Sequence, residues 1–157
     1  GGYDWQRRSY NASRNTAIET TTTYKPLVSI RMAPGRTDSI VIPAMSEVHP
    51  TSNGSYQAAL FLNSTLTGGT WVASETGNVQ YNISETSMSG GSILATEYFS
   101  SSILTRMGTH FGGQERVFLQ LGRSNADTPV SHTLTLAVRS ISGTGDAVGS
   151  FSWYDNI

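Results

Sequence analysis

Histidines are the side chains of this chain best suited by type to bind a metal ion or to move a proton near neutral pH. The three histidines, His49, His110 and His132, lie far apart, and none belongs to an HxH or HExxH pattern. Such a pattern would place two imidazoles on one face of a strand or helix, where they could share a zinc ion. Cysteine is absent from the sequence, which removes thiolate ligands and disulfides. We therefore expect three unrelated histidines, in loops or at strand ends, and no metal site.

Paired carboxylates would indicate another chemistry, the cleavage of a glycosidic bond, which needs two such groups about 5 to 10 Å apart. Glu97, which precedes Tyr98, is the first candidate for a member of such a pair. Surface carboxylates of β-proteins more often serve solubility, and we expect that role here. The candidates for the pair are Asp38, Glu75, Glu85, Glu97 and Glu115.

Serine and glycine are abundant, but their contexts do not indicate catalysis. No serine lies in a GxSxG elbow, where a strand-turn-helix context exposes it as a nucleophile. The glycine pairs at 68–69, 90–91 and 112–113 lack the lysine or the following helix of a phosphate-binding loop, so we interpret them as turns. The residue types and their spacing thus predict a protein that is not an enzyme and uses no cofactor.

The aromatic side chains leave two interpretations open. Trp71, Tyr81 and Trp153 could form a platform on which a sugar ring stacks, with Asn and Asp side chains nearby to bond its hydroxyls. In the other interpretation, which we favour, Trp71 and Trp153 fill the core or a subunit interface. Trp5 lies in a polar region, and we expect this tryptophan to reach a partner chain.

Composition narrows the classes of partner. Charged residues make up 13% of the 157 residues, against about 25% in typical proteins, and the net charge is −1. This balance argues against nucleic acid as a main partner. We interpret the small basic group of Arg7, Arg8 and Arg14 as solvated or paired with a neighbouring subunit. No apolar run approaches the length of about 18 residues that a membrane helix needs, so we expect no membrane partner.

The elements that would position these side chains are β-strands. In residues 130–156, Leu134, Leu136 and Val138 alternate with polar residues, a period of two that is typical of a strand with one apolar face. A Gly- and Asp-rich link at 142–146 follows, and then a segment that contains Phe151 and Trp153. Because glycine supplies the positive φ of tight turns, we predict that the chain closes with a β-hairpin.

Two regions are expected along the chain. Residues 1–16 are polar apart from a few aromatic side chains, and we predict an extended N-terminal arm that packs on the body or on a neighbour. Residues 17–157 are predicted to form one domain, an all-β antiparallel β-sandwich of jelly-roll type. The residues of the arm expected to contact a second subunit are Tyr3, Trp5, Arg7, Arg8 and Tyr10. Strands are expected at 17–32, 39–44, 56–62, 71–73, 79–83, 93–99, 103–107 and 116–121 as well as in the closing hairpin.

Within the first of these strands, Pro26 suggests an edge position or a bulge, because proline donates no hydrogen bond to a ladder. Pro43 is expected to end the second strand, and residues 45–53 to form a loop.

Four segments carry a resemblance to known proteins: LFLNSTLTGGTWV at 60–72, GGSILATEYF at 90–99, HTLTLAVRS at 132–140 and VGSFSW at 148–153. Together they resemble a β-rich domain of tailed-bacteriophage virion proteins, and the likeness spans roughly residues 55–155. Head decoration, fibre and other tail components contain such domains. The resemblance implies a non-enzymatic part of a virion, built as a symmetric oligomer, and it carries no catalytic residues to transfer.

The sequence therefore predicts a virion structural protein that associates with itself, with a trimer favoured, and with other virion proteins. The alternative is a carbohydrate- or receptor-binding β-sandwich that recognises a host-surface glycan through exposed aromatic side chains. The two hypotheses differ in one observable feature, since the second requires Trp71, Tyr81 or Trp153 to be exposed.

Overall fold

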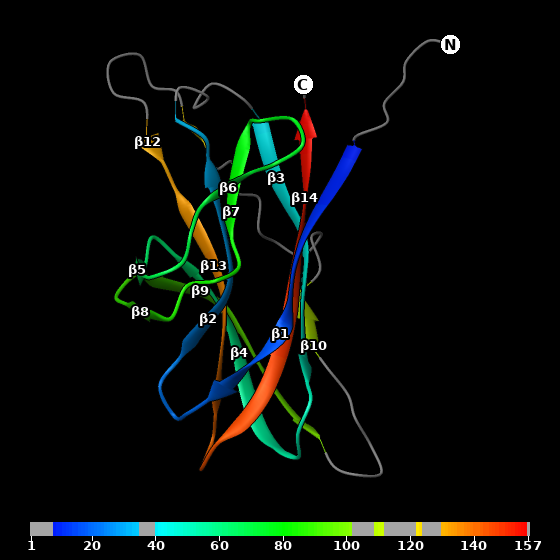
Figure 1. The fold of residues 1–157 in the computed structure, drawn as a ribbon, viewed down its shortest axis with the longest axis vertical. Coiled ribbons are helices and arrows are strands. Elements are labelled where there is room, and N and C mark those ends of the chain that lie inside the picture. The colour runs from blue at the N-terminus through cyan, green and yellow to red at the C-terminus, as the bar shows by residue number, and fades with distance from the viewer. Residues whose placement is uncertain (1–7, 35–39, 102–108, 112–121, 124–129, 157) are drawn as a thin grey trace.

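The computed structural model describes residues 8–34, 40–101, 109–111, 122–123 and 130–156, and every regular element in them is a β-strand. Two antiparallel sheets pack face to face (Figure 1), with the strand orders β1-β14-β3-β10 and β6-β7-β2-β13-β4-β9. Two short pairs, β5-β8 and β11-β12, complete the described elements. The predicted antiparallel β-sandwich is thereby confirmed. None of the described segments is a helix long and apolar enough to cross a membrane.

The strands have the following bounds: β1 Arg8–Thr20, β2 Lys25–Met32, β3 Ile40–Pro50, β4 Gly54–Leu62, β5 Thr65–Thr67, β6 Val72–Ala73, β7 Val79–Asn82, β8 Ser87–Ser89, β9 Ser92–Ser101, β10 Thr109–Phe111, β11 Gly122–Arg123, β12 Val130–Ser131, β13 Thr133–Ser140 and β14 Gly145–Asn156. The predicted strands at 56–62, 79–83 and 93–99 correspond to β4, β7 and β9. Those predicted at 103–107 and 116–121 lie outside the described residues.

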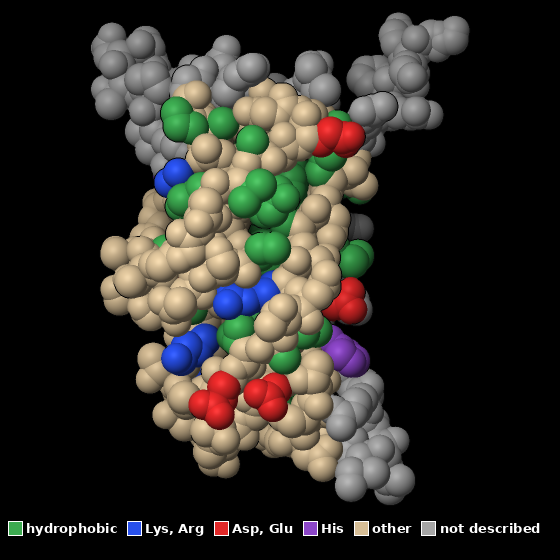
Figure 2. Space-filling view, in the orientation of Figure 1, with side chains coloured by type: hydrophobic (Ala, Val, Ile, Leu, Met, Phe, Trp, Pro, Cys, Tyr) green, Lys and Arg blue, Asp and Glu red, His purple; other side chains and the backbone are tan. Residues whose placement is uncertain are grey.

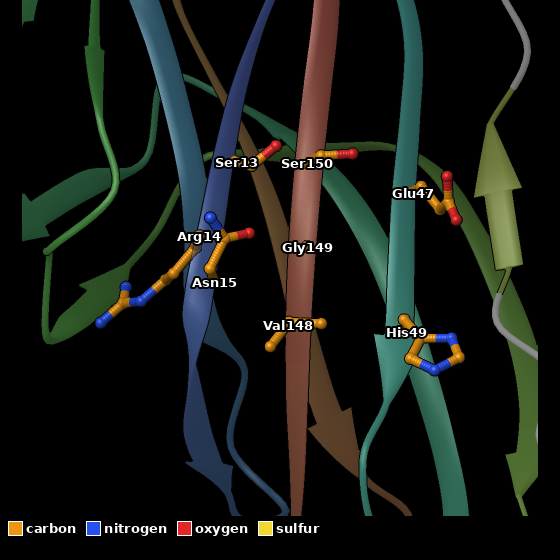
Figure 3. Close-up of a pocket in the computed structure, with 8 residues that line it drawn as sticks. All are labelled: Ser13, Arg14, Asn15, Glu47, His49, Val148, Gly149 and Ser150. Carbon is orange, nitrogen blue, oxygen red and sulfur yellow. The ribbon is translucent and has the colours of Figure 1, made fainter.

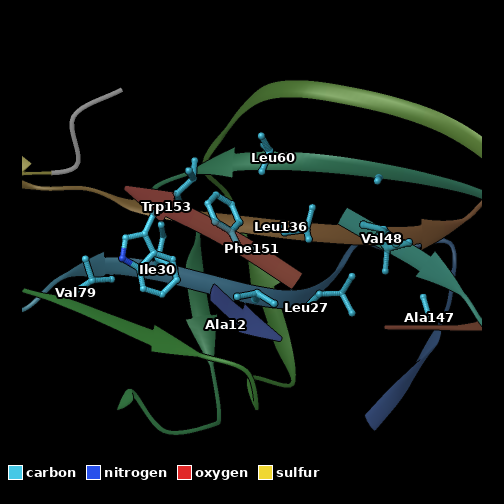
Figure 4. Packing of buried hydrophobic residues seen from close by; sticks show 14 of the residues in the cluster. Ala12, Leu27, Ile30, Val48, Leu60, Val79, Leu136, Ala147, Phe151 and Trp153 are labelled. Atoms are coloured by element: carbon cyan, nitrogen blue, oxygen red, sulfur yellow. The ribbon is translucent and has the colours of Figure 1, made fainter. Parts of the chain in front are cut away.

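The core lies between the two sheets (Figure 4). Alternation along β13 directs Leu134, Leu136 and Val138 inward, and all three are fully buried. From the opposite sheet, β14 contributes Phe151 and Trp153, each 1% exposed. Burial of each of these side chains contributes about 1.5–3 kcal/mol to the stability of the fold. The apolar faces of the alternating strands therefore supply most of the driving force for folding.

The predicted closing hairpin is wrong. β13 pairs with β2 and β4 in the six-stranded sheet, whereas β14 pairs with β1 and β3 in the four-stranded sheet. Residues 141–144 therefore carry the chain from one sheet to the other. A period of two shows which face of each strand is apolar, but it does not show whether two successive strands share a sheet or face each other across the core.

The N-terminal region shows no boundary at residue 16. Residues 8–16, expected in an extended arm that packs on the body or on a neighbour, form the first part of β1, which pairs with β14 from Arg8 opposite Asp155 to Thr20 opposite Gly145. The strand predicted at 17–32 is divided at 21–24, where the chain passes from β1 in one sheet to β2 in the other. The polarity of residues 8–16 gave no sign of a strand, because an edge strand buries few side chains and gains its place through backbone pairing. Tyr3, Trp5 and Arg7 lie outside the described residues.

The prolines lie where the ladders can tolerate them. β2 is a central strand, yet β7 pairs only with Ser29–Met32, so Pro26 lies beyond the end of that ladder. On its other side, the register with β13 shifts between Leu136 and Ala137, which confirms a bulge at this proline but not an edge strand. Pro43 does not end its strand: β3 continues to Pro50, with a register shift opposite Phe151 and Trp153. The loop predicted at 45–53 is thus largely strand.

The connection between the sheets gives the first testable prediction. A Cβ on Gly145 would overlap the hydroxyl of Tyr56 and lie 2.9 Å from two of its ring atoms, Cε1 and Cζ. Tyr56 cannot easily give way, since its hydroxyl donates to the Ser52 carbonyl at 2.8 Å. Replacement of Gly145 by alanine should therefore lower the free energy of unfolding by about 1–3 kcal/mol, measured by urea denaturation.

Ser142 provides the matched control, because it lies in the connection that leads to Gly145 and is exposed. Ser142→Ala should leave the free energy of unfolding within about 0.5 kcal/mol of the parent value. Equal free energies of unfolding for the two variants would show that Tyr56 leaves room for a Cβ on residue 145.

Candidate functional site

A row of polar and aromatic side chains crosses the outer face of the six-stranded sheet, the face opposite the core. The strand registers place Arg139 of β13 opposite Gln57 of β4, and Gln57 opposite Tyr98 of β9. Their neighbours in sequence on β13 and β4, Val138 and Ala58, are buried in the core, so alternation turns this row outward. Tyr98 is 68% exposed, the highest exposed fraction among the large apolar and aromatic side chains of the described residues.

Contacts within this outer-face row fix the orientation of Arg139. Its Nε donates to Gln57 Oε1 at 2.8 Å, and its guanidinium carbon lies 5.6 Å from the ring centre of Tyr24. Tyr24 in turn packs edge-on against Phe61, with ring centres 5.0 Å apart. Burial raises the pKa of the Tyr24 phenol, against the opposing effect of Arg139, which favours the phenolate. The row therefore contains a cation, Arg139, that its hydrogen bond to Gln57 holds in place. Tyr24 lies beside this cation, and Tyr98 lies on the same face of the sheet.

A second arginine on the outer face has a related arrangement. Arg31 Nε donates to Gln80 Oε1 at 2.9 Å, and the Arg31 guanidinium lies 4.0 Å above the centre of the Trp71 ring. Desolvation lowers the pKa of Arg31. Because the guanidinium already covers one face of Trp71, that face is not open to a sugar ring.

The three aromatic side chains that the sequence left open as a platform do not form one exposed surface. Trp153 is 1% exposed, with the Tyr10 ring stacked at 6.3 Å and the Tyr81 ring at 6.4 Å. Tyr81 packs against the core, and Trp71 is half-buried beneath Arg31. For Trp153 the core interpretation is confirmed. The exposed aromatic row was missed, although alternation in residues 56–62 indicated that Gln57 would face away from the core.

A shallow groove of 190 Å³ lies on the outer face of the other sheet, across β1, β14 and β3 (Figure 3). Its lining includes Ser150, Glu47 and His49, the residue types of a hydrolytic triad. Among the described residues, however, no hydrogen bond or ion pair joins these three side chains. The residues that line the groove are Ser13, Arg14, Asn15, Glu47, His49, Val148, Gly149 and Ser150.

Of the carboxylates considered for glycoside cleavage, the three within the described residues do not form a pair in a groove. Glu85 is buried, whereas Glu75 and Glu97 are exposed on different elements. Asp38 and Glu115 lie outside the described residues. Within the described part of the chain, no group of three or more His, Cys, Asp or Glu side chains could hold a metal ion. His132 contacts Asn63 through Nδ1 at 3.1 Å, and His49 and His110 belong to β3 and β10.

Among the described residues, Glu85 is the charged residue most completely removed from solvent, at 1% exposure. Its Oε1 accepts a hydrogen bond from Ser29 Oγ at 2.7 Å, and Ser29 contacts Thr135 Oγ1 at 2.8 Å. Arg14 Nη1 donates to the backbone carbonyls of Glu85 and Pro26, at 3.0 and 3.2 Å. Burial raises the pKa of Glu85, although the Ser29 hydrogen bond and the charge of Arg14 oppose this effect. These bonds fasten β1 of one sheet to β2 of the other.

The surface is otherwise poor in charge, and uncharged polar side chains and backbone cover most of the face in Figure 2. Its main apolar feature is β9, an edge strand. Of the six exposed large apolar side chains in the described residues, three lie on β9: Ile93 at 53%, Leu94 at 41% and Tyr98 at 68% exposure. In the described structure β9 pairs with β4 alone, which leaves its other edge without a ladder partner. Comparison with known proteins adds no assignment, since no family model, curated protein or solved structure matches this chain.

The raised pKa of Glu85 predicts a pH dependence of stability. An acid whose pKa is higher in the folded state than its ordinary value of 4.5 stabilises the fold below that pH, and this contribution is lost as pH rises through the folded pKa. Glu85→Gln, which mimics the protonated side chain, should therefore gain stability relative to the parent as pH rises from 4 to 8. Each unit of pKa shift corresponds to about 1.4 kcal/mol, measurable by urea denaturation at each pH.

Glu75→Gln serves as the control, since Glu75 is exposed and has no charged partner among the described residues. Its difference from the parent measures what the loss of one exposed carboxylate contributes over the same pH range. A stability difference between Glu85→Gln and the parent that stays constant, or that grows as pH falls, would contradict the raised pKa of Glu85.

Proposed function

We propose that this chain is a non-enzymatic structural protein of a bacteriophage virion, a self-associating β-sandwich module of jelly-roll type that decorates the capsid or forms part of a fibre or tail. The observation that carries the self-association is the β9 edge, with Ile93 and Leu94 exposed. The assignment to a virion rests on the resemblance of residues 55–155 to virion domains.

Edge strands with exposed apolar side chains are templates for pairing with another chain. At about 3.3 Å per residue, the ten residues of β9 span roughly 33 Å, long enough for a continuous ladder between two subunits. β1, the edge of the other sheet, differs in character, because its exposed side chains include Asn11, Asn15 and Glu19. The apolar edge is therefore the better candidate for a subunit contact.

The symmetry of the assembly depends on which surface of the neighbouring subunit β9 contacts. Pairing of β9 with β9 of a second copy would give a two-fold dimer, whereas a trimer, which we favour, requires β9 to meet a different surface of its neighbour. The N-terminal residues Tyr3, Trp5 and Arg7 are proposed to add to that contact. Tyr10 contributes less to it, since its ring already stacks on Trp153 within the same subunit.

Replacement of Ile93 and Leu94 by lysine tests the role of β9. Two charges on this edge should oppose the approach of a second subunit and convert the oligomer of the parent chain into a monomer, as measured by light scattering. Ile141→Lys is the matched control, because Ile141 is also exposed, at 39%, but lies between β13 and β14. This control should keep the mass of the parent.

Three outcomes would count against the proposal. A monomeric parent chain would exclude self-association, and an unchanged mass for the double variant would exclude β9 as the contact. Removal of residues 1–7, which leaves β1 intact, should weaken the oligomer if these residues contribute to it. Mass spectrometry of purified particles of the phage that encodes the chain tests its place in the virion, and absence of the chain there would overturn that part.

A further inference from the structure

We propose that the outer-face row of Arg139, Gln57 and Tyr98, together with Tyr24, binds the carboxylate-bearing sugar of an acidic glycan. This binding activity goes beyond a structural role and does not depend on the virion assignment. It requires a cation that is available to an anion and an aromatic ring that is available to a sugar, and the outer face provides both within one cross-strand row.

Arg139 provides the cation. Its Nε donates to Gln57 at 2.8 Å, which holds the guanidinium plane in one orientation and leaves the terminal nitrogens outside that bond. Among the described residues, no Asp or Glu forms an ion pair with Arg139. A planar guanidinium with two terminal N–H groups matches the two oxygens of a carboxylate. Gln57 is 8% exposed, so a buried amide keeps the cation in place before any ligand arrives.

Tyr98 provides the ring. It is 68% exposed and lies in register with Gln57, hence on the same face as Arg139. Tyr24, whose ring lies 5.6 Å from the Arg139 guanidinium, borders the cation and is itself held by Phe61. Large aromatic side chains with a polar hydroxyl contact the apolar face of a sugar and bond its hydroxyls at the same time.

The chemistry favours an acidic sugar over other anions. A nucleic acid would need a basic patch that tracks a phosphate backbone, and the net charge of −1 does not supply one. A neutral sugar would use the ring of Tyr98 and leave the cation without a partner. A uronic or sialic acid satisfies both groups, because one face of its ring is apolar and its carboxylate lies at the edge of the same ring.

Arg31 offers a matched comparison on the same face of the sheet. It is likewise held by a glutamine, Gln80, through Nε at 2.9 Å. Its guanidinium, however, lies 4.0 Å above Trp71 and covers the ring that a sugar would use. Loss of Arg31 therefore changes the charge of the outer face by the same amount as loss of Arg139, without removing the proposed site.

Saturation-transfer NMR and calorimetry with two acidic probes, an alginate trisaccharide and sialyllactose, test the proposal, with maltotriose as the neutral reference. We expect the parent chain to bind at least one acidic probe at least tenfold more tightly than maltotriose. Arg139→Gln and Tyr98→Ser should each weaken that binding at least tenfold, whereas Arg31→Gln should leave it within twofold. Retention of the β-sheet circular dichroism spectrum and of the thermal transition shows that each variant is folded.

The proposal is overturned if neither acidic probe binds, or if maltotriose binds as tightly. It is also overturned if Arg31→Gln and Arg139→Gln weaken binding equally, since this would indicate a general effect of surface charge. Self-association and glycan binding are separable, because the Ile93 and Leu94 double variant should become monomeric while it keeps its affinity for the acidic probe.

Discussion

The packing of β13 against β14 across the core is the interaction on which the rest of the molecule depends. These strands are joined by only residues 141–144, yet each is a central strand of a different sheet. Leu134, Leu136 and Val138 on one side face Phe151 and Trp153 on the other, and all five are buried. A short link between the two centres keeps the sheets in contact at high local concentration, and the remaining strands of the two sheets are arranged around β13 and β14.

Polar contacts then fix the position of the two sheets relative to each other. Arg14 of β1 reaches the carbonyl of Pro26 in β2, at the point where the β7 ladder has ended. At the other end, Asp155 of β14 accepts hydrogen bonds from Thr76 at 2.5 Å and from Asn78 at 3.1 Å. Both contacts satisfy polar groups that would be costly to bury alone, so they favour one relative position of the sheets over others.

This architecture separates stability from recognition. The core takes the aromatic side chains Trp153, Phe151 and Tyr56, while the outer face of the six-stranded sheet keeps Tyr98 exposed beside Arg139. Because side chains alternate along each strand, residues of the core and residues of the outer face can be substituted independently. The proposed association through the β9 edge and the proposed binding of a ligand on the outer face therefore use different parts of the module.

The sequence by itself determined the class of fold and the apolar face of most strands, because both follow from a period of two along the chain. It also predicted the strand at 56–62 and favoured Trp153 in the core. Tertiary structure alone decided that β13 and β14 face each other instead of pairing, that residues 8–16 join a sheet, and that Arg139, Gln57 and Tyr98 form one row. Pairing between strands depends on register and on long-range contacts, for which the local sequence carries no signal.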